Sequence, residues 1–255
     1  MTEIVLLGTG TSQGVPVICC HCEVCRSSDE KDKRLRSSAL IRSGGKTIVI
    51  DAGPDFRQQM LRENVNDIDA ILLTHEHKDH TGGIDDIRPF NFMNNKSVDI
   101  YCEPNVAEVI KLDYRYAFKE NKYPGVPEMK IHEIGLSPIK IGDMEIIPIR
   151  VLHMNLPILG FRVGKFAYIT DASFIEPKEI LKLNGIEVLV INAVRKKKHY
   201  SHFNIDDALE VINSVNPNKA YLTHISHSLG IYSDINKELP QGVELGYDGL
   251  KILLD

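Results

Sequence analysis

Short apolar runs, each closed by polar or turn-forming residues, recur along the whole chain. Runs of this kind are typical of buried strands. They predict strands over residues 4–7, 38–42, 46–50, 68–73, 98–102, 130–134, 139–141, 144–151, 160–163, 166–169, 188–191, 219–222 and 250–253. The turn Ser43-Gly44-Gly45 joins two of these runs, which therefore form a hairpin.

Apolar residues at helical spacing separate the runs. They predict helices over 84–90, 103–118 and 205–215, and one with a single buried face around Phe56 and Met60. Asn204 suits the N-cap of the third of these helices. Residues 26–36 mix both signs of charge and predict a solvated loop or short helix. Without an internal repeat or a low-complexity linker, the pattern predicts a single α/β domain over residues 1–255.

Composition narrows the class of protein. Hydrophobic residues make up 43% of the 255 residues and charged residues 25%, as in ordinary soluble domains. The net charge of −5 argues against a dedicated nucleic-acid binder. No apolar run is long enough to span a membrane, and the first residues do not resemble a signal peptide. We therefore expect a cytoplasmic protein without a membrane partner.

Metal-ligating residues gather just after the strand predicted over 68–73. Three histidines and an aspartate (His75, His77, Asp79, His80) fall within six residues, on a loop that follows the strand. Imidazole nitrogens and carboxylate oxygens are ligands that Zn, Mn and Fe accept. A single histidine is usually a satisfied polar residue, but this density predicts a metal site.

Three further strands end in a ligand-type residue, namely His153, Asp171 and His224. Each alone would more often be structural, but the recurrence strengthens the prediction of a metal site. Asp51 also follows a predicted strand. It either orients a metal-bound histidine or acts as a turn residue or N-cap.

The cysteines predict a second metal site. Cys20, Cys22 and Cys25 are close enough in sequence to share one metal, and four ligands would close its shell and make it structural. Spacing alone does not name the fourth ligand. Cys19 and His21 are weaker candidates, and inert buried thiols are the alternative. The glycine-rich stretch 8–16 lacks the spacing of a dinucleotide-binding loop, and it favours a plain turn or a loop lining the site.

The motif His75-x-His77-x-Asp79-His80, followed by the later strand-end ligands, resembles the metallo-β-lactamase superfamily. The resemblance implies a four-layer αββα sandwich with two divalent metals, Mn, Zn or Fe. It implies that one metal is held by His75, His77 and His153. The other would be held by Asp79, His80 and His224, with Asp171 bridging the two.

Within the superfamily, Ser12-x-Gly14-x-Pro16, Asp51-Ala52-Gly53-Pro54-Asp55 and Thr223-His224-Ile225-Ser226-His227 look like the PhnP-type phosphodiesterases, which are related to tRNase Z. That resemblance implies a structural zinc on Cys20, Cys22, Cys25 and His227. It also implies that His202 approaches the two metals without ligating them. A role at the helix start is the alternative for His202, and His199 is a weaker rival for its place.

By this resemblance the protein is a metal-dependent phosphodiesterase. A hydroxide bridging two metals would attack phosphorus, and His202, as imidazolium, would protonate the leaving oxygen. His202 and Asp79 are thus the expected catalytic residues. The expected substrate is a small cyclic or diester phosphate, such as a ribosyl 1,2-cyclic phosphate.

Three other functions use related residues. A tRNA 3′-end endonuclease finds support only in the basic run Arg195–Lys198, which a solvated or phosphate-steering patch explains equally well. A PqqB-like, non-hydrolytic role shares the cysteine loop but departs at the catalytic ligands. Thioester or lactone hydrolysis would leave His202 without a task. The sequence is compatible with a homodimer but carries no signal of oligomeric state.

Overall fold

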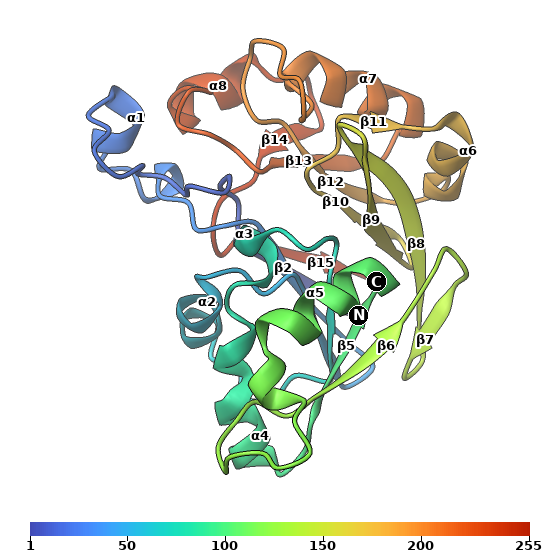
Figure 1. Cartoon of the computed structure of the whole chain (residues 1–255). Helices are drawn as coiled ribbons and strands as arrows, with labels where there is room; N and C mark the ends of the chain where they lie inside the picture. Colours follow the sequence, from blue (N-terminus) through green and yellow to red (C-terminus); the bar gives the residue numbers. More distant parts are fainter.

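Two β-sheets pack face to face, and helices cover the outer face of each, in the computed structural model of residues 1–255 (Figure 1). The first sheet has the order β15-β1-β2-β3-β4-β5-β6. Its strands are β1 (Thr2–Gly8), β2 (Ser38–Ser43), β3 (Lys46–Ile50), β4 (Ala70–Leu72), β5 (Val98–Cys102), β6 (Met129–Glu133) and β15 (Lys251–Leu254). From β3 to β6 the strands run parallel, so that the carboxyl ends of β3 and β4 meet at one edge.

The second sheet has the order β11-β8-β9-β10-β12-β13-β14, and β7 pairs with β8. Its strands are β7 (Ile139–Ile141), β8 (Met144–His153), β9 (Leu156–Val163), β10 (Phe166–Ile169), β11 (Phe174–Ile175), β12 (Val188–Asn192), β13 (Lys219–Thr223) and β14 (Val243–Leu245). Strands β10, β12, β13 and β14 are parallel. The predicted four-layer αββα sandwich is confirmed.

Both faces of each sheet are buried, which explains the continuous apolar runs. Along β1, Ile4 and Leu6 belong to the core between the two sheets, whereas Val5 and Leu7 pack under the helices. Tyr168, on β10, is among the largest fully buried side chains of the core between the sheets. Strand β1 therefore contributes side chains to two cores, one between the sheets and one under the helices.

The helices form the two outer layers (Figure 1). Over the first sheet and at its edge lie α2 (Phe56–Arg62), α3 (Lys78–Thr81), α4 (Arg88–Asn94) and α5 (Pro104–Asp113), with 3-10 turns at Ile84–Ile87 and Arg115–Ala117. Over the second lie α6 (Pro177–Ile180), α7 (Ile205–Val215) and α8 (Tyr232–Glu238), with a 3-10 turn at Leu181–Leu183. A loop that protrudes from the N-terminal half carries α1 (Glu23–Arg26) and a 3-10 turn at Glu30–Asp32.

Two predicted helices differ from those observed. The helix predicted over 84–90 is a 3-10 turn followed by α4, because Pro89 fits only the first turn of an α-helix. The helix predicted over 103–118 ends at Asp113, and a 3-10 turn follows. There Tyr114 leaves helical geometry and its hydroxyl donates to the carbonyl of Thr81.

The solvated character predicted for residues 26–36 is wrong at two positions. Arg34 is buried and donates to Thr9 Oγ1 at 2.8 Å and to the carbonyl of Gly246 at 2.6 Å. Asp32 is buried and accepts a hydrogen bond from the backbone of Tyr232 at 2.8 Å. Gly246 and Tyr232 lie 212 and 200 positions away in the chain from Arg34 and Asp32, which is why local charge did not reveal these contacts.

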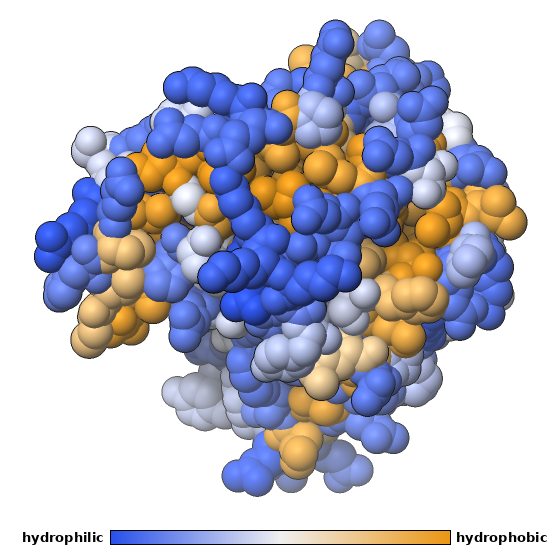
Figure 2. Space-filling model, turned by 90° about the horizontal axis from the view of Figure 1, so that it is seen from above, coloured by the Kyte–Doolittle hydropathy of each residue, from blue (hydrophilic) through white to orange (hydrophobic).

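No helix is long and apolar enough to cross a membrane. Seen from above, the surface over the second helical layer is mainly hydrophilic, with apolar stretches between the charged side chains (Figure 2).

Candidate metal centre

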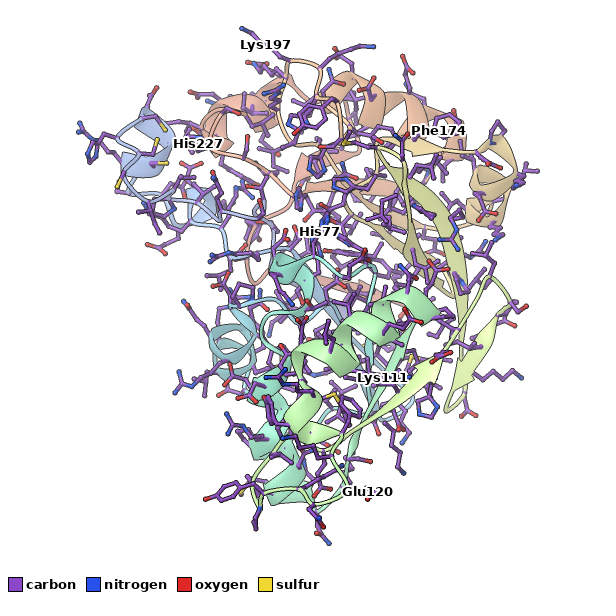
Figure 3. The ribbon with its side chains drawn as sticks, in the orientation of Figure 1. His77, Lys111, Glu120, Phe174, Lys197 and His227 are labelled. Carbon is purple, nitrogen blue, oxygen red and sulfur yellow. The ribbon has the colours of Figure 1, made fainter.

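The histidine cluster lies directly beyond β4, as predicted, although only part of it is loop. His77 is the N-cap of α3, and Lys78 to Thr81 form a single helical turn that includes His80. This turn brings His80 back beneath His75, with ring centroids 4.3 Å apart. His75 Nε2 lies 3.0 Å from His77 Nδ1. His75 and His80 are buried, whereas His77 is exposed at the opening between the two halves (Figure 3).

The second half of the chain faces this cluster with three residues. His153 is the last residue of β8, and its ring lies 5.3 Å from His77 and 5.9 Å from His75. Asp171 follows β10 and His224 follows β13. The structure therefore brings together all seven side chains that the sequence predicted for the dinuclear site.

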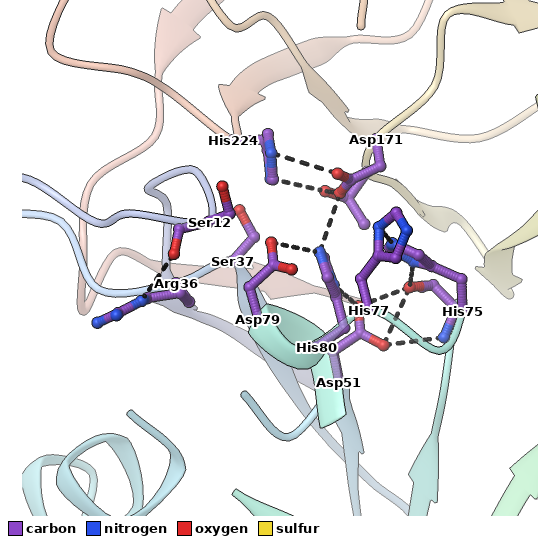
Figure 4. Close-up of polar contacts among 12 residues, drawn as sticks. Ser12, Arg36, Ser37, Asp51, His75, His77, Asp79, His80, Asp171 and His224 are labelled. Carbon is purple, nitrogen blue, oxygen red and sulfur yellow. Dashed lines mark hydrogen bonds and ion pairs between the residues drawn. The ribbon is translucent and has the colours of Figure 1, made fainter. Parts of the chain in front are cut away.

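Asp171 lies between the two groups of histidines (Figure 4). One carboxylate oxygen is 3.2 Å from His80 Nε2, and the other is 3.2 Å from His224 Nε2. Asp79 approaches the same His80 nitrogen at 3.2 Å. Ligand atoms of Asp79, His80, Asp171 and His224 all lie within 4.8 Å of one another. Such an arrangement suits a carboxylate shared by two cations.

The residues present fit divalent cations. His80 Nε2 is buried and has no hydrogen-bond partner, although two carboxylates stand close to it. An orphaned buried nitrogen is rare unless something absent from the chain satisfies it. The nitrogen and oxygen donors are those that Zn, Mn and Fe accept.

The protonation states favour a cation. Burial raises the pKa of Asp171, but the imidazoles of His224 and His80 lower it more, and it ends well below its usual value. Burial also lowers the pKa of His75, which leaves its ring neutral and free to ligate. The carboxylates around His80 outweigh burial and hold its pKa well above normal. In the metal-free protein a proton on His80 thus stands where a cation would bind, and metal binding releases it.

Asp51 orients the cluster, which resolves the alternatives left open by the sequence. Its carboxylate is fully buried and accepts from the backbone and hydroxyl of Thr74, at 2.8 and 2.9 Å. It also lies 2.7 Å from Nδ1 of His80. This bond fixes the ring so that Nε2 points toward Asp79 and Asp171.

The sequence did not predict that threonines directly before the ligands would contact them. Thr74 Oγ1 lies 2.9 Å from His75 Nδ1, and Thr170 donates to Asp171 at 2.6 Å. Thr223 also precedes His224, but its buried hydroxyl has no hydrogen-bond partner. The signal was present in the sequence, because a threonine stands directly before the ligand at three of the strand ends.

The four residues predicted for the structural zinc also meet. Nδ1 of His227 lies 3.1 Å from Cys20 Sγ, 3.4 Å from Cys22 Sγ and 3.5 Å from Cys25 Sγ. The Cys22 thiol has its pKa lowered to about 6, chiefly by the hydrogen bond from the backbone of Cys25. Cys19 and His21, the weaker candidates, are exposed and outside the group.

His202 lies beside the centre, as expected. Its ring is 4.7 Å from that of His153 and 4.8 Å from that of His224, and its buried Nδ1 has no hydrogen-bond partner. Its position is fixed by the capping box of Asn204 and Asp207 at the start of α7. Burial lowers the pKa of His202 to about 3 in the metal-free protein, so the imidazolium expected during catalysis stays a prediction.

A polar cleft of about 320 Å³ opens onto His202 and His224. The loop Thr11–Gln13 forms one wall, which agrees with a glycine-rich loop that lines the site. Arg195 and His199 also line the cleft. The sequence did not decide whether Arg195 belongs to the site, since a solvated or a phosphate-steering patch explains its basic run equally well.

An αββα sandwich with a His and Asp centre at one edge of its sheets defines a metal-dependent hydrolase. Residues 46–225 match the family model described as a beta-lactamase superfamily domain. The chain belongs to the metallo-β-lactamase superfamily and, within it, to the PhnP family. A crystal structure of a diphosphatase from the PhnP family superimposes with a TM-score of 0.93 and 37% identity, over 98% of this chain and 96% of that one.

Two curated proteins of similar sequence are named for other activities than the PhnP-family diphosphatase. An octanoyltransferase of Porphyromonas gingivalis is 42% identical over 98% of this chain, which spans only 51% of that relative's length. A ribonuclease Z of Mycolicibacterium gilvum is 27% identical over 76% of this chain and 66% of its own length. The chain thus spans about half of the first relative and about two thirds of the second.

Proposed function

We propose that the protein is a dinuclear phosphodiesterase that hydrolyses a small cyclic or linear phosphodiester, such as a ribosyl 1,2-cyclic phosphate. The observation that carries the proposal is the convergence of seven ligand-type side chains, with His202 beside them in a polar cleft. The PhnP-family diphosphatase supports phosphorus chemistry, since its overall fold and length match this chain closely.

The residues of the site would have different roles. His75, His77 and His153 would hold one divalent metal, Asp79, His80 and His224 the other, and Asp171 both. Bound at this site, two such cations lower the pKa of water and neutralise charge on phosphoryl oxygens. His202 reaches into the cleft from the start of α7 and would donate a proton or hydrogen bond to the leaving oxygen.

The cleft favours a small substrate over tRNA. Its volume of about 320 Å³ suits a single small ligand, at the lower end of known ligand pockets. The basic run is partly neutralised, because Lys196 pairs with Glu238 at 2.5 Å and Lys198 lies 3.9 Å from Asp207, whereas Arg195 and Lys197 have no carboxylate partner. Neither a nucleic acid nor a membrane is therefore part of the proposal. The ribonuclease Z relative makes precursor tRNA a necessary comparison.

The test is a substrate panel with the Mn- or Zn-loaded protein. It contains bis(p-nitrophenyl) phosphate, cyclic nucleotides, ribose 1,2-cyclic phosphate, precursor tRNA and an octanoyl thioester. We expect turnover of at least one small diester and none of tRNA or the thioester. A protein that binds two metals beyond its tightly held zinc, yet cleaves no phosphodiester, would refute the proposal.

His202→Ala tests the role of that residue. We expect kcat to fall by about 10²–10⁴-fold on a diester with an alkoxide leaving group, and far less with p-nitrophenolate, which needs no proton. His132→Ala is the matched control, because His132 is an exposed histidine that pairs with Asp99 far from the centre. Equal losses on both leaving groups would remove the proton-donor role.

A further inference from the structure

The metal centre draws its ligands from both halves of the molecule, each half being one sheet with its helices. The histidine cluster beyond β4 belongs to the first half, whereas His153, Asp171 and His224 come from the second. In the proposed assignment each cation has ligands from both halves. The metal affinity of the centre therefore depends on how firmly the two halves are held at a fixed separation.

A cross-strand pair of the second sheet contacts the first half beside this centre. Arg150 on β8 and Leu159 on β9 stand opposite each other in the register of the two strands. The backbone N–H of Leu159 donates to the carbonyl of Thr74 at 3.0 Å. Thr74 directly precedes His75 and also donates to Asp51. This bond thus connects the second sheet to the segment that carries the histidine cluster.

Arg150 makes a further connection with its side chain. Its Nη1 and Nη2 donate to the two carboxylate oxygens of Glu103, at 2.6 and 2.5 Å. Glu103 directly follows β5 and is the N-cap of α5, so it belongs to the first half. A bidentate pair of this kind fixes both the distance and the orientation of its partners. The two side chains are only 20% and 13% exposed, so solvent screens the pair less than an exposed one.

The outer layer of the second half braces the same arginine. The backbone N–H of Arg150 donates to Oε2 of Glu179 at 2.7 Å, and Lys182 donates to the same oxygen at 2.7 Å. Glu179 lies on α6 and is buried. Three residues after Arg150, β8 ends at His153, a predicted metal ligand. Arg150 therefore links α6, β8 and α5, and it does so on the strand that carries a ligand.

We propose that the Arg150–Glu103 pair is a clamp that sets the separation of the two halves of the metal centre. The inference rests on the dinuclear centre of the proposed function but not on its substrate. A fixed separation pre-forms the site, so that metal binding does not have to order the two halves. Arg150 and Glu103 are positioning residues, since neither is among the ligands and neither lines the cleft.

The test measures metal affinity without turnover. Competition with a chromophoric chelator gives the affinity of Mn²⁺ or Co²⁺ for the centre, and metal analysis gives the zinc content. We expect Arg150→Met to lower the affinity of the centre by about tenfold or more, as for other residues that orient ligands. The zinc expected at Cys20, Cys22, Cys25 and His227 should stay bound. Loss of that zinc in the same proportion would show a general loosening of the fold and overturn the clamp.

A spectroscopic signature separates the clamp from a purely structural role. At saturating Mn²⁺, the exchange coupling between the two ions depends on their separation and is measured by electron paramagnetic resonance. We expect this coupling to change in Arg150→Met. A coupling identical to that of the wild type would contradict the clamp.

A double-mutant cycle shows whether the two side chains act through their bond. Glu103→Leu should lower the metal affinity about as much as Arg150→Met, and the double variant should lose no more than either single variant. Arg150→Lys keeps the charge but cannot bind both oxygens in the same way, so its loss should be smaller. Additive losses would show separate roles and overturn the clamp.

Arg42→Met is the matched control. Arg42 also pairs with a carboxylate, that of Glu3 at 2.8 Å, and donates to the carbonyl of Glu63, but both partners lie within the first half. Its substitution should lower the melting temperature without changing the metal affinity of the centre. Equal losses of affinity in Arg42→Met and Arg150→Met, or unchanged affinity in Arg150→Met, would overturn the clamp.

The outcomes separate the clamp from the proposed function. A metal affinity that depends on Arg150, in a protein that cleaves no phosphodiester, supports the clamp and refutes the phosphodiesterase. Hydrolysis by a protein whose metal affinity does not depend on Arg150 supports the phosphodiesterase and overturns the clamp.

Discussion

Three residues around the metal centre hold a backbone conformation that non-glycine residues rarely adopt. Asp51, Asp171 and His224 have φ values of 62°, 59° and 53°. Each such residue costs about 1–2 kcal/mol. Asp51 and His224 stand directly after a strand and Asp171 stands two residues after one, where the left-handed geometry turns the side chain from the strand direction into the site. Strain of this kind persists where surrounding contacts over-determine it, and here the contacts are those of the centre.

Asp51 should control metal affinity without being a ligand. Asp51→Ala removes the acceptor that faces His80 and Thr74. We expect metal affinity to fall by about 10–100-fold. Competition with a chromophoric chelator measures it. Asp99→Ala is the control, since that carboxylate pairs with an exposed histidine, His132. Unchanged affinity in Asp51→Ala would contradict the orienting role.

We expect the contribution of Asp248 to the free energy of unfolding to depend on pH. Burial raises its pKa to about 6, although it accepts bonds from the Leu35 backbone and Thr9 Oγ1. Between about pH 4 and 6 the folded state then binds more protons than the unfolded state, so the free energy of unfolding falls as pH rises. The expected loss across this window is roughly 2–3 kcal/mol.

Asp248→Asn should remove this loss. In urea titrations of the metal-free protein from pH 4 to 7, the stability of wild type minus variant should decline between about pH 4 and 6. Asp143→Asn, at an exposed turn residue, should give a difference that does not change with pH. A constant difference for Asp248→Asn as well would exclude the titration of this group.

At the scale of elements, most strands and the helix around Phe56 and Met60 were predictable, whereas β11, β14 and most of the short helices were not. The runs at 139–141 and 166–169 match β7 and β10 end to end, because each strand is buried where its apolar residues lie. The helix α7 also matches, since eleven residues show both periodicity and a cap. The helices α1, α3 and α8 have four to seven residues, too few for a periodic signal.

The cysteine loop is expected to be a structural element rather than a catalytic one. Cys22→Ala should lose the tightly bound zinc and lower the melting temperature, while the diester activity per folded molecule persists. Metal analysis and thermal denaturation measure both effects. Cys19→Ala is the matched control, since Cys19 is adjacent, exposed and outside the group. Loss of activity with zinc retained would refute the structural assignment.

At the scale of the molecule, the metal centre joins the two halves of the sandwich. The cluster beyond β4 belongs to the first sheet, whereas His153, Asp171 and His224 belong to the second. The sequence predicted this set because each ligand follows an apolar run. The sequence could not predict that Arg195 lines the cleft. Only the folded loop brings it there and shows that its guanidinium bonds to backbone carbonyls and has no carboxylate partner.

Metal removal should therefore loosen the whole fold. A ligand at 1,000 times its Kd stabilises the folded state by about 4 kcal/mol, or roughly 10 °C in melting temperature for a chain of this size. We expect a shift of this order between metal-loaded and chelated protein. Asp171→Asn should lose the part due to the dinuclear centre, and Cys22→Ala the part due to zinc. A shift that both variants retain in full would contradict these sites.

Strands β1 and β15 give the molecule a common point of attachment for a second domain. Thr2 pairs with Leu254, so residues near both ends lie side by side at one edge of the first sheet. From there β1 runs seven residues, roughly 20 Å, before the chain reaches the loop that walls the cleft. A domain fused before residue 1 or after residue 255 would therefore be attached at this edge of the first sheet. The same placement suits a longer chain in which this region forms about half, as in the Porphyromonas gingivalis relative.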